Sequence, residues 1–288
     1  MARECFAVLK RHPALIVFPV ISGAALLAVL GAIAVSLLPQ LGALHNSTHG
    51  IWGKLGTHGS ANIWFYVTAY IAIYALTVIA VFFNVALVHC ALRCHAGQEP
   101  SINDGITAAA GCLPQILGWA LVATTVGIVL NVVESFLKDK LGFLGSLVGG
   151  LFEFGWATVT YFVVPVLVAE RVGPIAAIRR SAAILRAKWG ESLAGEARFG
   201  LIGLVFYLQA LALFFIGLAI LLSYGVTAMA GLGPLLMVLG IIYAVIISVV
   251  LQALSVIFQA GVYLYATTGA VPATLDRDLV EGAFRPKG

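Results

Sequence analysis

Charged residues in this chain lie almost entirely in the gaps between long apolar runs. They make up 10% of the residues, against about 25% in a soluble domain. Six apolar stretches are long enough to cross a bilayer, which takes roughly 20 residues of helix. Inside a bilayer a helix satisfies its own backbone hydrogen bonds. The pattern therefore predicts an all-α fold, a polytopic membrane bundle of six transmembrane helices.

The polar connections between these stretches are short, the longest being His45–Ala61 and Arg171–Arg198. Neither is long enough for an independent domain with its own core. We therefore expect a single six-span membrane domain over residues 1–270 and a cytoplasmic tail over residues 271–288. The six predicted spans are Ala14–Leu38, Ile63–His89, Leu113–Val133, Gly149–Ala169, Phe199–Ser223 and Pro234–Thr267.

The distribution of basic residues predicts the orientation. With the N-terminus inside, 13 of the 16 basic residues face the cytoplasm, and only Lys54, Lys138 and Lys140 face outward. This is the asymmetry that the positive-inside rule describes. We therefore expect a multi-pass protein of the cell inner (plasma) membrane with both termini in the cytoplasm. The same bias explains the net charge of +4, so no nucleic acid partner is expected.

Short segments of helical character precede spans one, three and five on the predicted cytoplasmic side. They are Arg3–His12, Ser101–Cys112 and Pro174–Trp189. The first and third end in basic residues that can face lipid phosphates, so we expect cytoplasmic interfacial helices. Two interpretations stay open: three units of interfacial helix plus membrane hairpin, or ordinary amphipathic loops without a repeat. The expected units cover residues 1–95, 100–171 and 174–268.

Proline and glycine positions predict features inside the spans. Pro19 and Pro165 lie near the cytoplasmic ends of spans one and four. Proline removes a backbone hydrogen bond, so we expect it to bend these helices. Gly145 and Gly149 are four residues apart at the start of span four. Such spacing allows a neighbouring helix to approach closely.

Several motifs together resemble a known family. They are Tyr161–Glu170, Gly173-Pro174, Arg180-Ser181, Trp189–Glu191, the spacing of Leu9, Pro13, Phe18 and Pro19, and Gly105. The chain resembles a bacterial family of uncharacterised six-span integral membrane proteins. More distantly it is similar to the membrane domain of some glycerophosphodiester phosphodiesterases and to Yip1-type membrane proteins. The resemblance implies the fold and topology, but no catalytic residues, because the soluble phosphodiesterase barrel is absent from this sequence.

Glu153 is the only acidic residue within the predicted spans. An acid at membrane depth is costly unless it is paired, protonated or close to water, so it is a candidate pathway or proton site. The alternative is structural, because Glu153 lies about one turn from the predicted outer boundary. There it has water, Lys138 and Lys140 within reach.

Polar residues recur along single faces of spans two and six. The stripes are Tyr66, Tyr70, Tyr74 and Thr77 with Asn84, and Ser248, Gln252, Ser255 and Gln259. Polar side chains avoid lipid, so they face either other helices or a wet cavity. The first interpretation predicts hydrogen bonds between helices. The second predicts a polar pathway lined by Asn131, Gln252, Gln259 and Glu153.

The loop before span five is rich in basic residues. Arg179, Arg180, Arg186 and Lys188 are the candidate contacts for anionic lipid headgroups. Basic residues near a membrane surface gain about 1 kcal/mol each from anionic lipid. The alternative is that they serve orientation alone.

Two groups of histidines and cysteines leave metal binding open. One contains His45, His49 and His58, and the other contains Cys90 and Cys94 with neighbouring histidines. Neither has the ligand pairs of a structural zinc site, and buried thiols commonly act as small apolar groups. We predict no metal and no cofactor.

The sequence contains no phosphate-binding loop, serine nucleophile motif or zinc-protease motif. We therefore predict no catalytic residues and no enzyme activity. The expected function is that of a non-catalytic membrane scaffold, lipid-interacting module or partner subunit. The expected partners are the bilayer and anionic headgroups, with a second copy or another membrane protein left open. The alternative is a small-solute or ion transporter or channel that uses Glu153 and the Gln252/Gln259 face.

Overall fold

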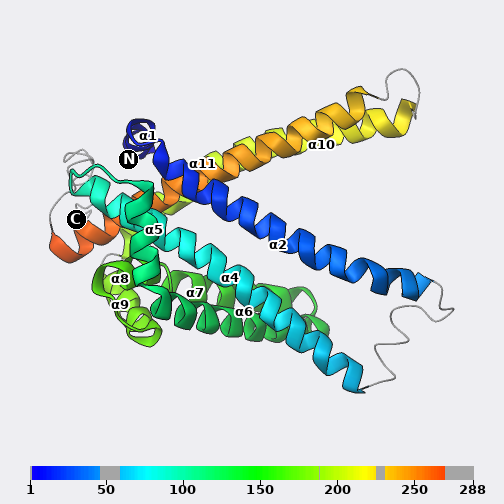
Figure 1. Ribbon diagram of the computed structural model, residues 1–288, viewed down its shortest axis with the longest axis horizontal. Coiled ribbons are helices and arrows are strands. Elements are labelled where there is room, and N and C mark those ends of the chain that lie inside the picture. The colour runs from blue at the N-terminus through cyan, green and yellow to red at the C-terminus, as the bar shows by residue number, and fades with distance from the viewer. Residues whose placement is uncertain (1, 46–58, 188, 225–230, 270–288) are drawn as a thin grey trace. The chain divides into compact units, whose positions relative to one another are not determined.

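The structure is a computed structural model that describes residues 2–45, 59–187, 189–224 and 231–269 (Figure 1). Regular elements in these ranges are all helices, and six segments are long and apolar enough to cross a membrane. The predicted all-α fold with six spans is confirmed. The helices are α1 (Ala2–Arg11), α2 (Ala14–His45), α4 (Gly59–His95), α5 (Ile102–Gly111), α6 (Leu113–Leu141), α7 (Phe143–Val159), α8 (Val163–Glu170), α9 (Pro174–Ala187), α10 (Trp189–Tyr224) and α11 (Leu232–Thr268).

The three short segments expected to be helical are α1, α5 and α9. Pro174 starts α9, where its missing N–H is not needed. Asp104 lies in the first turn of α5, where a negative charge favours the helix dipole. Lys10 and Arg11 lie in the last turn of α1, where positive charge is favoured. These helices are confirmed, while their position at a membrane interface stays a prediction.

Span four consists of two helices. α7 ends at Val159, α8 begins at Val163, and the three residues between them form a turn. Pro165 explains the break, because it lacks an N–H and its ring collides with the carbonyl group of Tyr161 in a continuous helix. In the first turn of α8 the missing N–H costs nothing. α2, in contrast, is continuous across Pro19.

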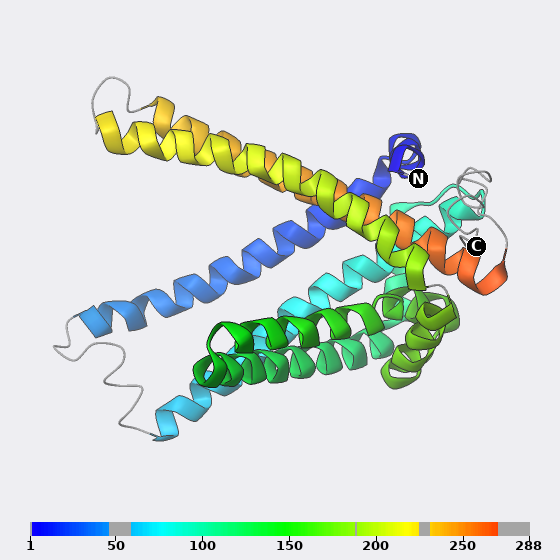
Figure 2. The same ribbon diagram turned by 180° about the vertical axis from the view of Figure 1, so that it is seen from behind.

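The chain divides into two compact units, which are described separately. The first contains Met1–Pro19, Cys90–Ile102 and Ala183–Gly288, and the second contains Val20–His89 and Asn103–Ala182. In the first unit α1 packs on α11, and α10 runs alongside α11 (Figures 1 and 2). In the second unit α6 and α7 form a hairpin (Figure 2). The three-hairpin organisation stays a prediction.

Glycines bring the paired helices close together. A side chain at Gly145 would overlap the carbonyl group of Leu137, so α7 approaches the backbone of α6 as predicted. In the other hairpin, a Cβ at Gly233 would lie 2.8 Å from the carbonyl oxygen of Gly217. A Cβ at Gly240 would lie 3.0 Å from the carbonyl oxygen of Ala210. Both hairpins therefore depend on small residues, as membrane helix pairs commonly do.

Buried residues gather at one end of the long helices. In α11, most residues from Ala253 to Tyr263 are buried, whereas those from Leu232 to Ile246 are mostly exposed. α4 shows the same trend, with its buried residues concentrated between Val81 and His95. In both helices the buried end is the one that the charge pattern assigns to the cytoplasmic side. The other end presents apolar side chains, as a lipid-facing helix does.

Candidate functional site

α9 has a basic exposed face. Arg179 and Arg186 are exposed, and Arg180 is half-exposed and paired with Glu170, with 2.9 Å between Nε of the arginine and Oε1 of the glutamate. Lys188 lies outside the described residues. Of the four predicted lipid contacts, Arg179 and Arg186 therefore present their charge on the exposed face of α9, and Arg180 shares its charge with Glu170.

The opposite face of α9 is buried. Ala177, Ser181, Ile184 and Leu185 are all buried, with spacings of three and four residues that place them on one helix face. The hydroxyl group of Ser181 donates to the carbonyl oxygen of Val159 at 2.6 Å. It also accepts from the backbone N–H of Phe162 at 3.0 Å. α9 is therefore attached to span four at the break between α7 and α8.

The turn between α8 and α9 is held by α6. Arg171 ends α8 in the left-handed conformation, with φ 50°, which is uncommon for a residue other than glycine. The Nε2 group of Gln115 donates to the carbonyl oxygen of Arg171 at 3.4 Å. Pro174 packs over Gly118, where a Cβ would come within 3.0 Å of the proline ring. These contacts fix the point from which α9 extends.

The predicted pathway residues divide between the two units. Asn131 on α6 and Glu153 on α7 are both exposed. A side chain at Gly149 would overlap that of Glu134, and Glu153 and Asn131 each lie about one turn from these two residues. They therefore lie at one level of the α6/α7 hairpin. In the first unit, Gln252 is exposed and Gln259 is half-buried on α11.

Glu134 is an acidic residue that the sequence analysis missed. α6 continues to Leu141 rather than ending at Val133, so Glu134 and Asp139 belong to this candidate span. The expectation that Glu153 is the only acid in a span is therefore wrong. Glu134 has 23% of its side chain exposed and lies 3.5 Å from Lys138, one turn further along α6. The spacing of Glu134 and Lys138 by four residues was the available signal.

The polar stripe of span two makes hydrogen bonds between helices. The hydroxyl oxygens of Tyr70 and Thr125 are 2.9 Å apart. Thr124 donates to the hydroxyl oxygen of Thr77 at 3.1 Å. Tyr74 donates to a backbone carbonyl group of α6 at 3.3 Å. For these residues, the prediction of helix–helix hydrogen bonds is confirmed.

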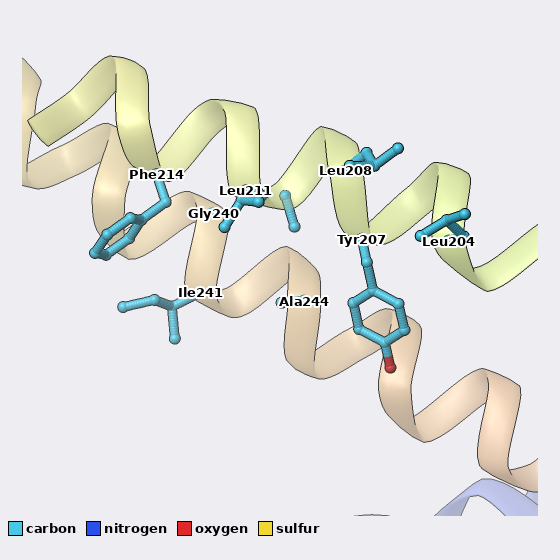
Figure 3. Close-up of a pocket in the computed structure, with 9 residues that line it drawn as sticks. Leu204, Tyr207, Leu208, Leu211, Phe214, Gly240, Ile241 and Ala244 are labelled. Atoms are coloured by element: carbon cyan, nitrogen blue, oxygen red, sulfur yellow. The ribbon is translucent and has the colours of Figure 1, made fainter. Parts of the chain in front are cut away.

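The α10/α11 hairpin combines polar links with an apolar groove. Tyr207 bonds to Ser248 at 2.8 Å, and Tyr243 donates to Gln209 at 2.9 Å. The groove beside these links has a volume of about 390 Å³. Figure 3 shows its walls, which are formed by Leu204, Tyr207, Leu208, Leu211, Phe214, Gly240, Ile241 and Ala244. Its lining is almost entirely apolar, as expected for a surface that contacts hydrocarbon.

His95 and Cys90, from the second of the two candidate metal groups, make structural hydrogen bonds. His95 is buried, and its Nε2–H donates to the carbonyl oxygen of Ile257 on α11 at 2.8 Å. Cys90 is buried and its thiol group donates to the carbonyl oxygen of Ser101 at 3.5 Å. No group of three potential metal ligands occurs within the described ranges. His49 and His58 lie outside the described residues, as does the side chain of His45.

Six long apolar helices, with polar links between helices and exposed apolar residues outside, define a polytopic helical membrane protein. Residues 62–273 match the profile of a family described as being of unknown function, DUF6159. The match covers well over half of the chain, from α4 to just beyond α11, so the chain belongs to this family. No curated protein and no solved structure gives a significant match.

Proposed function

We propose that this chain is a non-catalytic integral membrane protein that contacts anionic lipid headgroups through α9. The observation that carries the proposal is the two-sided character of α9. One face is buried and bonded to span four, while Arg179 and Arg186 are exposed on the helix. Ile175, near the start of α9, is 57% exposed and can enter the hydrocarbon region beside them.

The charge distribution supports an orientation with α9 on the cytoplasmic side. We propose that both termini lie in the cytoplasm and that the membrane is the inner (plasma) membrane of a bacterial cell. Anionic lipid in the cytoplasmic leaflet attracts basic residues within about a Debye length of the surface. The distant likeness to the phosphodiesterase membrane domain and to Yip1-type proteins adds no catalytic step to this proposal. Further partners are a second copy of the chain or another membrane protein.

Lipid retention after purification tests the proposal. The protein is extracted from vesicles of equal parts phosphatidylcholine and phosphatidylglycerol, and the bound lipids are counted by native mass spectrometry. We expect phosphatidylglycerol to be enriched on the wild type. Arg179→Gln with Arg186→Gln removes two contacts of about 1 kcal/mol each, so the preference decreases by roughly thirtyfold at most.

The matched control removes two basic residues elsewhere. Lys138 and Lys140 are exposed near the opposite end of the α6 span. Lys138 already pairs with Glu134, so Lys138→Gln with Lys140→Gln is expected to lower the phosphatidylglycerol count less than the α9 double variant does. Equal losses in the two double variants would indicate a general charge effect and contradict a role of α9.

Transport remains the alternative function. Its support is that Asn131 and Glu153 lie at one level of the α6/α7 hairpin and are both exposed. The groove on the other hairpin is apolar, and the tyrosines beside it bond across the helices. Proton entry into vesicles loaded with a pH-sensitive dye tests this alternative. A transport role predicts entry that Glu153→Gln abolishes.

A further inference from the structure

The break in span four leaves backbone groups without their helical partners. Residues 160–162 form the turn between α7 and α8. In a continuous helix, the N–H of Phe162 would bond to the carbonyl group of Thr158, and the carbonyl group of Val159 to the N–H of Val163. Phe162 is fully buried, so water does not reach its backbone to replace such bonds. Another part of the chain must therefore supply them.

Ser181 supplies both partners from α9. Ser181 is fully buried. Its hydroxyl group accepts from the N–H of Phe162 and donates to the carbonyl oxygen of Val159. A hydroxyl group can do both at once, because it carries one donor and two acceptor positions. No apolar residue of similar size can replace it. The interrupted hydrogen-bond ladder of span four is therefore completed by one side chain of a neighbouring helix.

Arg180 forms a second link at the adjacent position. It pairs with Glu170 at the end of α8, 2.9 Å away. Both partners are substantially exposed, with 50% and 31% of their side chains accessible. An exposed ion pair of this kind is weak and open to competition from other charges. The phosphate group of an anionic lipid presents the same chemistry to Arg180 as the carboxylate of Glu170 does.

We infer that Ser181 and Arg180 form a latch that couples lipid contact at α9 to the conformation of span four. The inference rests on the proposed contact between α9 and anionic lipid. A headgroup that binds Arg180 breaks its ion pair with Glu170 and weakens the attachment of α9 to span four. Ser181 then withdraws, and the break at residues 160–162 opens. The lipid favours the released state because Arg180 there binds phosphate instead of the carboxylate of Glu170.

Hydrogen exchange measured by mass spectrometry tests the latch in the full chain. The protein is placed in nanodiscs of phosphatidylcholine, and exchange is followed in the peptide that contains residues 159–163. Ser181→Ala is expected to accelerate exchange there by roughly tenfold, since local opening controls the exchange of protected amides. Thr158→Val is the control, because the Thr158 hydroxyl bonds within its own helix to Phe154. It is expected to leave the Phe162 amide unchanged.

Lipid dependence tests the coupling. Nanodiscs of equal parts phosphatidylcholine and phosphatidylglycerol should accelerate exchange at residues 159–163 of the wild type by several-fold, as expected for a shift toward the released state. Ser181→Ala should be fast in both lipids. Glu170→Gln should be faster than the wild type in phosphatidylcholine and respond less to phosphatidylglycerol, because the ion pair between Arg180 and the Glu170 carboxylate is already removed.

Three outcomes would contradict the latch, its coupling to lipid, or the proposed function. Equal exchange in the wild type and in Ser181→Ala would show that Ser181 does not hold the break, and would overturn the latch. Phosphatidylglycerol bound to the protein without any change in exchange would overturn the coupling while leaving the proposed function intact. If protein released from the same nanodiscs carried no excess of phosphatidylglycerol, both the latch coupling and the proposed function would be overturned. Exchange in peptides of α10 and α11 reports whether a variant has lost its fold.

Discussion

Gly217→Ala is expected to separate α10 from α11. A Cβ at this position would lie 2.5 Å from the carbonyl oxygen of Gly233 and 2.9 Å from the backbone nitrogen of Met237. Both are backbone atoms of α11, so no side-chain rotation relieves the overlap. Ordinary contact begins at 3.4 Å, and the helices must therefore move apart locally by about 0.9 Å.

Two effects of opposite sign determine the change in stability. Overpacking of a close contact costs about 1–3 kcal/mol. Alanine is a better helix former than glycine and returns up to about 1 kcal/mol. We therefore expect Gly217→Ala to lower the free energy of unfolding by about 1–2 kcal/mol. Gly200→Ala in the same helix meets no atom within 4 Å, so only the favourable effect applies and the variant is neutral or more stable.

Unfolding in mixed micelles measures both variants. The protein is held in dodecylmaltoside, the fraction of dodecyl sulfate is increased, and helix content is followed by circular dichroism. The two substitutions are chemically identical and occur in one helix, so they differ only in what the new methyl group meets. A shift of equal size and sign in both variants would refute the reasoning.

Further predictions concern the second unit and the topology. Gly145→Ala meets the backbone of Leu137 and should destabilise the α6/α7 hairpin in the same assay, whereas Gly150→Ala meets nothing and should not; equal stability of the two would contradict the close approach. A double-mutant cycle of Thr77→Val and Thr124→Val should give a coupling energy of about 0.6 kcal/mol, and a coupling of zero would exclude a direct bond. An impermeant maleimide added to intact cells should label Lys140→Cys, and should label Arg179→Cys only after permeabilisation; the reverse result would invert the orientation. The native cysteines in the described residues are buried and should contribute little background.

The sequence was sufficient to predict the six spans, because apolar length is a property of each segment alone. The hydrogen bonds of the span-two stripe could also be predicted from a local pattern. Tyr70, Tyr74 and Thr77 repeat at helical spacing, and polar groups that share a face in a membrane need partners. The contact at Gly145 could be predicted from residue size, since its spacing from Gly149 allows close helix approach.

Ser181 and Glu134 show where prediction from the sequence ended. The role of Ser181 depends on the return of α9 to a break that lies 19 residues earlier in the chain, which no local pattern records. Pro165 indicated a bend in span four, but it did not indicate that Ser181 would bond to the backbone there. Glu134 was missed because the predicted end of span three was placed by hydropathy, whereas α6 continues through Glu134 and Lys138, which pair one turn apart.

The burial of α11 at its C-terminal end has a consequence for what holds the first unit together. α11 has 37 residues, about 55 Å of helix at 1.5 Å per residue, whereas the hydrocarbon core is about 30 Å thick. If its exposed N-terminal part occupies the bilayer, the buried residues near Ile257, together with His95 and the apolar face of α1, reach the aqueous boundary. Water drives the packing there, as it does in a soluble protein. We therefore expect urea to destabilise the packing at the C-terminal end of α11. Changes in bilayer thickness should instead affect its exposed N-terminal end.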